Sequence, residues 1–168
     1  PHSVHLDRII SDVMGAQLDR NPVVEWAATQ VRRYRDRLYL LSRMVQIDPD
    51  KELPWQSTDK LLLPADMGVL YLTDQEGRPL NAEDLKPHRL IVRFRQGGEH
   101  CQPLGRGCRK SLKALFQETG VLPWMRQQIP VIYLDDDVLA VGGICQCAPS
   151  ILEGSCVRVK VAWELNGQ

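Results

Sequence analysis

Hydrophobic positions near the start of the chain recur at the spacing of one face of a helix. Two apolar rows lie between residues 3 and 18, one of them containing Val4, Ile9, Val13 and Met14 and the other containing Leu6, Ile10 and Leu18. This spacing predicts an amphipathic helix over residues 3–18. Because a proline disfavours helix at the residue before it, the helix is expected to end by Asn21 and Pro22.

A different period begins at residue 29, in the stretch TQVRRYRDRLYLL. Its alternation predicts a strand or hairpin, with Arg33, Arg35 and Arg37 on the same face as Val31. From residue 48 to residue 64, prolines, charges and polar residues recur, and Trp55 is the only large aromatic residue. This composition is typical of a connecting segment and predicts a domain boundary, with one domain over residues 1–64 and another over 65–168.

Two stretches after this boundary carry clear strand patterns. The stretch GVLYLTDQEGRPL predicts a strand, a turn and a returning strand, and HRLIVRFRQGGE predicts another strand that ends in a Gly-Gly turn. In the second stretch, Leu90, Val92 and Phe94 are expected to face the core. The residues of the other parity would then form a mostly basic outer surface, and they are Arg89, Ile91, Arg93 and Arg95.

The last third of the chain adds one helix and further short strands. Ser111 predicts the N-cap of a helix with an apolar side, and Gly120 is its stop signal. The stretch LPWMRQQIP predicts a short helix or turn, VIYLDDDVLAVGGICQ predicts a hairpin, and residues 156–165 alternate as a last strand. Short strands interleaved with short helices, without regular βαβ spacing, predict an α+β fold with a mainly antiparallel sheet.

Composition bounds the class of protein. The chain has 168 residues, 43% of them hydrophobic, and its 21 Lys and Arg balance its 21 Asp and Glu. This is enough chain for a real hydrophobic core, and any signal for a charged partner must come from local clustering. No apolar run approaches the roughly 18 residues that span a bilayer, so no membrane association is expected. The odd number of cysteines predicts a reducing compartment, with the cytoplasm as the default.

The strongest candidate for binding is a concentration of cations in the middle of the chain. Between residues 89 and 113 only Glu99 is acidic, whereas the basic residues are Arg89, Arg93, Arg95, Arg106, Arg109, Lys110 and Lys113. The guanidinium fork matches phosphate oxygens, and the predicted helix start offers free N–H groups. A polyanion-binding surface is therefore favoured over a merely solvated face. The turn is not a P-loop for ATP, because Leu104 and Arg109 stand where that motif needs glycine.

The arginines of the first domain form a second candidate. They are interleaved with tyrosines, so arginines could follow phosphates while an aromatic ring stacks on a base; the residues are Arg32, Arg33, Arg35 and Arg37, with Tyr34 and Tyr39. A half-buried strand with a charged outer face and Asp36 as an internal partner would give the same pattern, and this structural interpretation is the stronger of the two.

Catalytic and metal sites find little support in the sequence. The cysteines are Cys101, Cys108, Cys145, Cys147 and Cys156, and only Cys145 and Cys147 come near the spacing of zinc ligands, so we interpret the cysteines as buried thiols. The run Asp135–Asp137 is interpreted as a turn. No Ser/His/Asp or Cys/His arrangement suited to activating a nucleophile stands out. The sequence thus predicts neither a catalytic residue nor a metal site.

Two blocks of sequence resemble the C-terminal part of bacterial tRNA(Ile)-lysidine synthetases. The first block is GAQLDRNPVVEW followed by VRRYRDRLYLL. The second block contains VRFRQGGE, PLGRG, KSLKALFQETGVLPWMR and IPVIYLDDDVLAVGGI. The resemblance implies that the helix at the start ends a substrate-binding subdomain, and that residues 65–168 form a C-terminal subdomain that binds tRNA. It places the tRNA-binding positions at Arg93, Arg95, Arg106, Arg109, Lys110, Lys113 and Arg126, besides the candidates Arg33 and Arg35.

The same resemblance defines expectations for chemistry and partners. Such enzymes use ATP and Mg²⁺ to join lysine to the wobble cytidine of tRNA(Ile), in an N-terminal domain with a Ser-Gly-Gly-x-Asp-Ser motif. That motif is absent from this sequence, so we expect no cofactor in this chain and no activity from it alone. tRNA(Ile) is the expected partner, and homodimerisation is left open. The alternative function is a protein-interaction module whose basic face docks an acidic partner or a catalytic domain.

Overall fold

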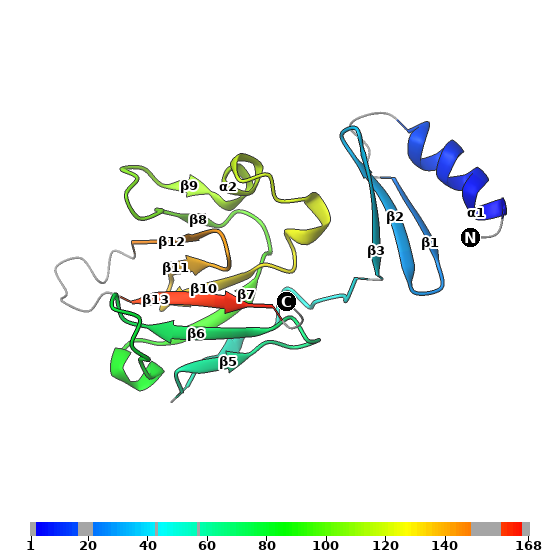
Figure 1. The fold of residues 1–168 in the computed structure, drawn as a ribbon. Coiled ribbons are helices and arrows are strands. Elements are labelled where there is room, and N and C mark those ends of the chain that lie inside the picture. The colour runs from blue at the N-terminus through cyan, green and yellow to red at the C-terminus, as the bar shows by residue number, and fades with distance from the viewer. Residues whose placement is uncertain (1–2, 17–21, 43, 57, 149–158, 166–168) are drawn as a thin grey trace. The chain divides into compact units, whose positions relative to one another are not determined.

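The computed structural model describes residues 3–16, 22–42, 44–56, 58–148 and 159–165 (Figure 1). The chain divides into two compact units, which are residues 1–46 and residues 47–168. The sequence placed the boundary 18 residues later, after residue 64. The two divisions differ by residues 47–64, which contribute two strands to the second unit.

The first unit pairs a short helical segment with a three-stranded antiparallel sheet. Helix α1 (Ser3–Arg8) continues directly into the wider helical turn η1 (Ile9–Met14), which confirms the predicted helix up to residue 14. The sheet has the order β1 (Val23–Trp26), β2 (Thr29–Tyr34) and β3 (Arg37–Ser42). Its core is small and consists of Val13, Val24 and Val31, with Ile9 and Trp26 packed against them.

The predicted hairpin of this unit is confirmed, but the predicted row of arginines is wrong. Strand β2 ends at Tyr34, which pairs with Arg37, so Arg35 lies in the turn. Its φ of 54° is a left-handed turn conformation rather than an extended one. Arg33, Arg35 and Arg37 therefore do not share one strand face, because the chain reverses between them.

The second unit contains a five-stranded antiparallel sheet, a three-stranded sheet and a two-stranded ribbon within its described residues (Figure 1). The largest sheet has the order β12 (Cys145–Gln146), β11 (Asp137–Val141), β10 (Pro130–Leu134), β7 (Leu90–Phe94) and β4 (Leu53–Pro54). The three-stranded sheet has the order β13 (Lys160–Glu164), β6 (Val69–Thr73) and β5 (Lys60–Leu62). The ribbon pairs β8 (His100–Cys101) with β9 (Lys110–Ser111).

Three short helical segments complete the described part of this unit. They are η2 (Ala82–Leu85), α2 (Leu112–Glu118) and η3 (Pro123–Met125). The predicted helix cap is confirmed, because the Ala114 amide donates to Ser111 Oγ at 3.2 Å. Gly120 follows the helix with a φ of 72°, as a stop signal requires. The predicted α+β fold with mainly antiparallel sheets is thus confirmed, and no described helix is long and apolar enough to cross a membrane.

Side chains from both faces of the five-stranded sheet are buried. Ile132 belongs to a cluster that includes Leu70 and Leu72 of β6, whereas Val131 and Tyr133 belong to a second cluster formed with α2. Consecutive residues of β10 therefore face two separate cores. Because Arg93 pairs with Val131 in the register, Arg93 faces the core under α2.

This packing corrects the expected basic outer surface of β7. Ile91 is only 3% exposed, and Arg93 and Arg95 are half-buried. The alternation of β7 is as predicted, but its face opposite the first hydrophobic core is covered by the second hydrophobic core. An alternating strand pattern does not reveal whether its polar face meets water or another layer.

The segment before residue 65 is also corrected. Trp55 is 2% exposed, belongs to the first cluster, and donates from its indole Nε1 to the Thr58 carbonyl oxygen at 3.0 Å. Strands β4 and β5 lie in the segment that was predicted to connect two domains. The segment is thus an integral part of the second unit.

The structure confirms the hairpin of β10 and β11 and the turn between them. Asp135 has a φ of 53° and accepts hydrogen bonds from the Arg89 amide at 2.8 Å and from His88 Nδ1 at 2.9 Å. The Arg89 amide first and His88 second hold the pKa of Asp135 below its ordinary value. The last strand is confirmed as β13, and its predicted first residues, 156–158, lie outside the described residues.

Candidate functional site

The glycine-rich loop between β8 and β9 carries the most accessible cations of the predicted cluster. Arg106 and Arg109 lie in the loop and are exposed, Lys110 begins β9 and is partly exposed, and Lys113 is exposed in the first turn of α2. We call these four residues the loop cations. The Ser111 cap fixes where α2 begins, so the loop cations are held at its N-terminal end.

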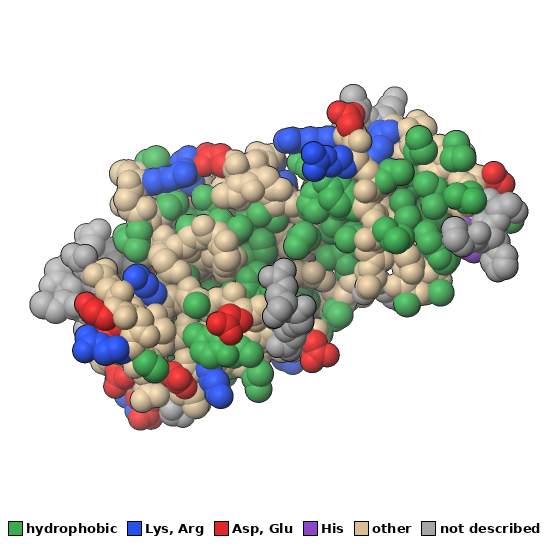
Figure 2. Space-filling view, viewed as in Figure 1, with side chains coloured by type: hydrophobic (Ala, Val, Ile, Leu, Met, Phe, Trp, Pro, Cys, Tyr) green, Lys and Arg blue, Asp and Glu red, His purple; other side chains and the backbone are tan. Residues whose placement is uncertain are grey.

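Glu118 at the end of α2 neutralises part of this charge. Its carboxylate accepts from Lys110 Nζ at 2.6 Å and from Arg106 at 2.9 Å. The hydrogen bond from Lys110 and then that from Arg106 lower the pKa of Glu118, so it stays ionised at neutral pH. In Figure 2, basic and acidic side chains lie next to each other over the β9–α2 region.

Arg109 and Lys113 are the cations of this group without a counter-charge. Within the described part of the chain, neither has a hydrogen bond or an ion pair from its side chain, and both are exposed. Exposed cations without partners are available to an incoming anion at no cost in broken ion pairs. The loop therefore presents two free positive charges beside two that share one carboxylate.

Arg93 and Arg95 have structural partners instead. Arg93 Nε donates to Glu52 at 2.8 Å, and its guanidinium carbon lies 4.9 Å from the centre of the Tyr133 ring. Tyr133 is buried, and burial raises its pKa. Arg95 lies 3.9 Å from Glu99 and 5.8 Å from the centre of the Phe116 ring. Arg95 thus links β7 to α2, whereas Arg93 contacts a residue of β10 and a residue beside β4.

The three remaining predicted positions also contact the protein. Arg126 Nε donates to the Val121 carbonyl oxygen at 3.1 Å. In the first unit, Arg33 donates to the carbonyl oxygens of Met14, at 2.5 Å, and of Ala16. The Arg35 guanidinium lies 5.3 Å from the centre of the Tyr34 ring. Arg33 thus ties β2 to the end of the helical segment, whereas Arg35 is exposed in the turn.

The structure therefore reduces the number of cations in the predicted cluster that are free to bind an anion. Glu99 is the only acid between residues 89 and 113. In the folded protein, however, Glu52 forms an ion pair with Arg93, and Glu118 forms ion pairs with Arg106 and Lys110. Glu52 precedes Arg93 by 41 residues, and Glu118 lies five residues beyond the counted stretch, so a count within residues 89–113 includes neither acid. The loop cations remain accessible, as does Arg89, which is exposed just before β7 and apart from the loop.

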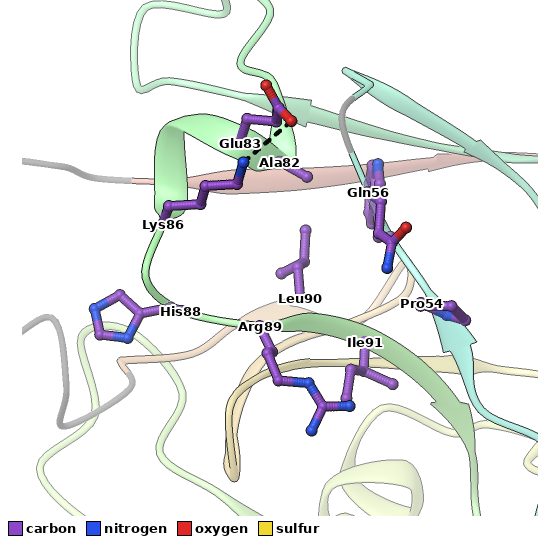
Figure 3. Close-up of a pocket in the computed structure, with 10 residues that line it drawn as sticks. Pro54, Gln56, Ala82, Glu83, Lys86, His88, Arg89, Leu90 and Ile91 are labelled. Atoms are coloured by element: carbon purple, nitrogen blue, oxygen red, sulfur yellow. Dashed lines mark hydrogen bonds and ion pairs between the residues drawn. The ribbon is translucent and has the colours of Figure 1, made fainter.

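A cavity of about 310 Å³ near the start of β7 is the alternative place for a ligand (Figure 3). Lys86 and Glu83 lie on one side of it and form an ion pair at 3.2 Å. Figure 3 shows Leu90 pointing towards η2, while Arg89 and Ile91 point to the opposite side of the strand. The cations that line this cavity are therefore not gathered towards one point, and it is a weaker anion site than the loop.

The cysteines show an arrangement that the sequence did not reveal. Cys101 and Cys147 are buried, as predicted, whereas Cys145 is half-buried and Cys108 is exposed. Cys156 lies outside the described residues. The sulfur atoms of Cys101, Cys145 and Cys147 lie within 4.8 Å of one another. The only sequence signal was the single-residue spacing of Cys145 and Cys147, since Cys101 comes 44 residues earlier.

Comparisons with known proteins agree on one family. A family model described as the TilS substrate C-terminal domain matches residues 90–163, and one described as the TilS substrate binding domain matches residues 1–39. A tRNA(Ile)-lysidine synthase of Coxiella burnetii is 37% identical over 147 residues, covering 88% of this chain and 32% of that protein. The corresponding protein of Methylococcus capsulatus is 34% identical over 161 residues, covering 96% of this chain and 36% of that protein.

A solved structure supports the fold. The crystal structure of a TILS C-terminal domain superposes with a TM-score of 0.50 and 20% identity, covering 70% of this chain and all of that one. The present chain spans about a third of the length of its curated relatives. The loop cations all fall within residues 90–163, the range matched by the C-terminal family model.

Proposed function

The chain belongs to the tRNA(Ile)-lysidine synthase family, and we propose that its second unit binds tRNA through the loop cations. The observation that carries this proposal is the position of Arg109 and Lys113 in the matched C-terminal domain, where both are exposed and have no counter-charge among the described residues. Arg106 and Lys110 join them when a phosphate competes with Glu118. Arginine is suited to this role because its planar fork donates two parallel hydrogen bonds to phosphate oxygens.

The contacts of such a surface would be to the backbone rather than to bases. An A-form RNA duplex displays phosphates and 2′-hydroxyls more openly than base edges, so recognition by a charged loop depends mainly on shape and phosphate spacing. We propose the acceptor stem of tRNA(Ile) as the duplex that the loop meets. Arg93, Arg95, Arg126 and Arg33 support the fold and have smaller parts in binding, and exposed Arg35 adds a charge in the first unit.

The ligation of lysine to tRNA is proposed to take place outside this chain. We propose that ATP, Mg²⁺ and lysine are handled by regions that the longer relatives possess, and that this chain contributes binding without a cofactor of its own. The substrate named for the relatives, tRNA(Ile), would be its partner, and the cytoplasm its location. No residue of the chain is assigned to catalysis.

Charge reversal tests the proposal directly. Arg109→Glu and Lys113→Glu should each weaken the binding of a tRNA(Ile) transcript, and the double variant should weaken it further. Lys60→Glu is the matched control, because Lys60 is equally exposed but lies on β5, in a different sheet. Loss of a phosphate contact should lower affinity without changing the preference among tRNAs.

The outcome separates tRNA binding from the alternative function. Equal weakening by Lys60→Glu would mean that only overall charge matters, and unchanged affinity in the double variant would contradict the proposed surface. If tRNA binding were unaffected while an isolated catalytic region of a relative bound less tightly to the double variant, the loop would serve a protein contact instead.

A further inference from the structure

Three cysteine sulfurs converge beneath the loop that carries the cations. Cys101 ends β8, and Cys145 and Cys147 lie in and just after β12, so the thiols come from two separate parts of the chain. The sulfurs all lie within 4.8 Å of one another, and those of Cys145 and Cys147 are 3.8 Å apart. The two segments are joined directly, because the Leu104 amide donates to the Gln146 carbonyl oxygen at 2.9 Å and the Ala148 amide donates to that of Gln102 at 2.9 Å.

This geometry matches that of sulfur ligands around one metal ion. Zinc binds thiolates at about 2.3 Å in a tetrahedral arrangement, which places two bound sulfurs about 3.8 Å apart. The Cys145–Cys147 distance already has that value, and the third sulfur needs to move by about 1 Å or less. Thiolates favour thiophilic ions such as zinc over magnesium or calcium, which prefer oxygen ligands.

The three thiols are buried on one side and partly open on the other, so their thiolate forms depend on a bound cation. Cys101 and Cys147 are 2% and 3% exposed in the core under α2, and half-buried Cys145 offers a way in for an ion.

We propose that Cys101, Cys145 and Cys147 bind a zinc ion. The thiols release their protons to solvent as the ion binds, and three Zn–S bonds form, with the fourth position left to water or another donor. The bound ion fastens the start of the cationic loop to β12. The site stands independently of any role in tRNA binding, because it rests only on the positions of the sulfur atoms.

Cobalt serves as the probe, because Co²⁺ occupies zinc sites and gives thiolate charge-transfer and tetrahedral visible bands. The reduced 168-residue chain should bind one Co²⁺ with these bands, and Zn²⁺ should abolish them. Cys101→Ser, Cys145→Ser and Cys147→Ser should each lose the bands or weaken binding more than tenfold, because even the loss of a residue that only supports a metal ligand costs about 10–100-fold. Cys108→Ser, at an exposed cysteine outside the cluster, should keep them.

A second experiment needs no substitution and therefore does not depend on whether a serine variant folds. It measures the alkylation of cysteine thiols in the unmutated chain with and without zinc. Zinc should protect half-buried Cys145 from iodoacetamide, with the modified residue located by mass spectrometry, while exposed Cys108 stays reactive. Absence of cobalt bands from the reduced chain would overturn the proposal. Bands that survive in Cys145→Ser, or zinc that leaves Cys145 as reactive as before, would overturn it as well.

Discussion

Replacing Glu118 with glutamine should tighten RNA binding without altering the stability of the fold. Glu118 accepts hydrogen bonds from Lys110 at 2.6 Å and from Arg106 at 2.9 Å. Between residues 105 and 118 it is the only acid against four basic residues, so the substitution changes the local charge from +3 to +4. Because the three side chains are partly exposed, their pairing contributes little to folding, and the thermal midpoint should not move.

The size of the effect follows from two simple terms. At a separation of about 6 Å in water, one unit charge changes the affinity for a phosphate about threefold. Each additional phosphate neutralised steepens the slope of log K against log salt concentration by roughly 0.7 to 0.9. Release of Arg106 and Lys110 to the RNA should therefore steepen the slope by about 1 to 2 and raise affinity severalfold at low salt.

The assay is a fluorescence anisotropy titration of labelled tRNA at several salt concentrations. Glu83→Gln is the matched control, because Glu83 is also exposed and paired with a lysine, but lies on η2. The difference from the unmutated chain should be constant between about pH 5 and pH 8, because hydrogen bonds from Lys110 and Arg106 lower the pKa of Glu118. It should shrink only in acid, where the carboxylate becomes protonated. An unchanged slope, or an equal gain from Glu83→Gln, would refute the reasoning.

Two further substitutions test the second unit by urea unfolding. Trp55→Ala should lower the free energy of unfolding by about 3–5 kcal/mol. Leu62→Ala, at a side chain that is 72% exposed, should change it by less than about 0.5 kcal/mol. A small effect of Trp55→Ala would contradict the conclusion that the segment around Trp55 is an integral part of the second unit. Asp135→Asn should destabilise the protein at pH 7 by up to about 1 kcal/mol. Its carboxylate has a lowered pKa because Arg89 and His88 donate to it, so that stabilisation disappears as the pH falls below about 4, and a deficit that persists in acid would contradict this cause.

Local features of the fold were predictable because their causes are local. The amphipathic spacing of residues 3–14, the Ser111 cap and the turn at Asp135 depend on neighbours within a few positions. Local signals of this kind set where elements begin and end. The same limit explains the wrong expectation for Arg35, because whether an arginine lies on a strand or in its turn depends on where two strands pair.

The environment of the site depended on residues far apart in sequence. The polar face of β7 is covered because α2, about 20 residues later, packs on it. Glu52 pairs with Arg93 across 41 residues, so a count around the strand leaves this arginine unopposed. The sulfur atoms of Cys101 and Cys147 likewise lie close together although the residues are 46 positions apart, and no local sequence pattern predicts this contact. The exposure of Arg106 and Arg109 was predictable because both lie in a glycine-rich turn, and such turns run over the protein surface.

The most direct test of tRNA binding compares duplexes of the two nucleic acids. An RNA duplex with the sequence of the tRNA(Ile) acceptor stem and a DNA duplex of the same length would be titrated with the chain and with Arg109→Glu over a series of salt concentrations. The account predicts tighter binding to RNA, and a shallower salt slope for Arg109→Glu, by about 1 for the lost phosphate contact. Equal affinity for RNA and DNA, with no effect of Arg109→Glu, would contradict it.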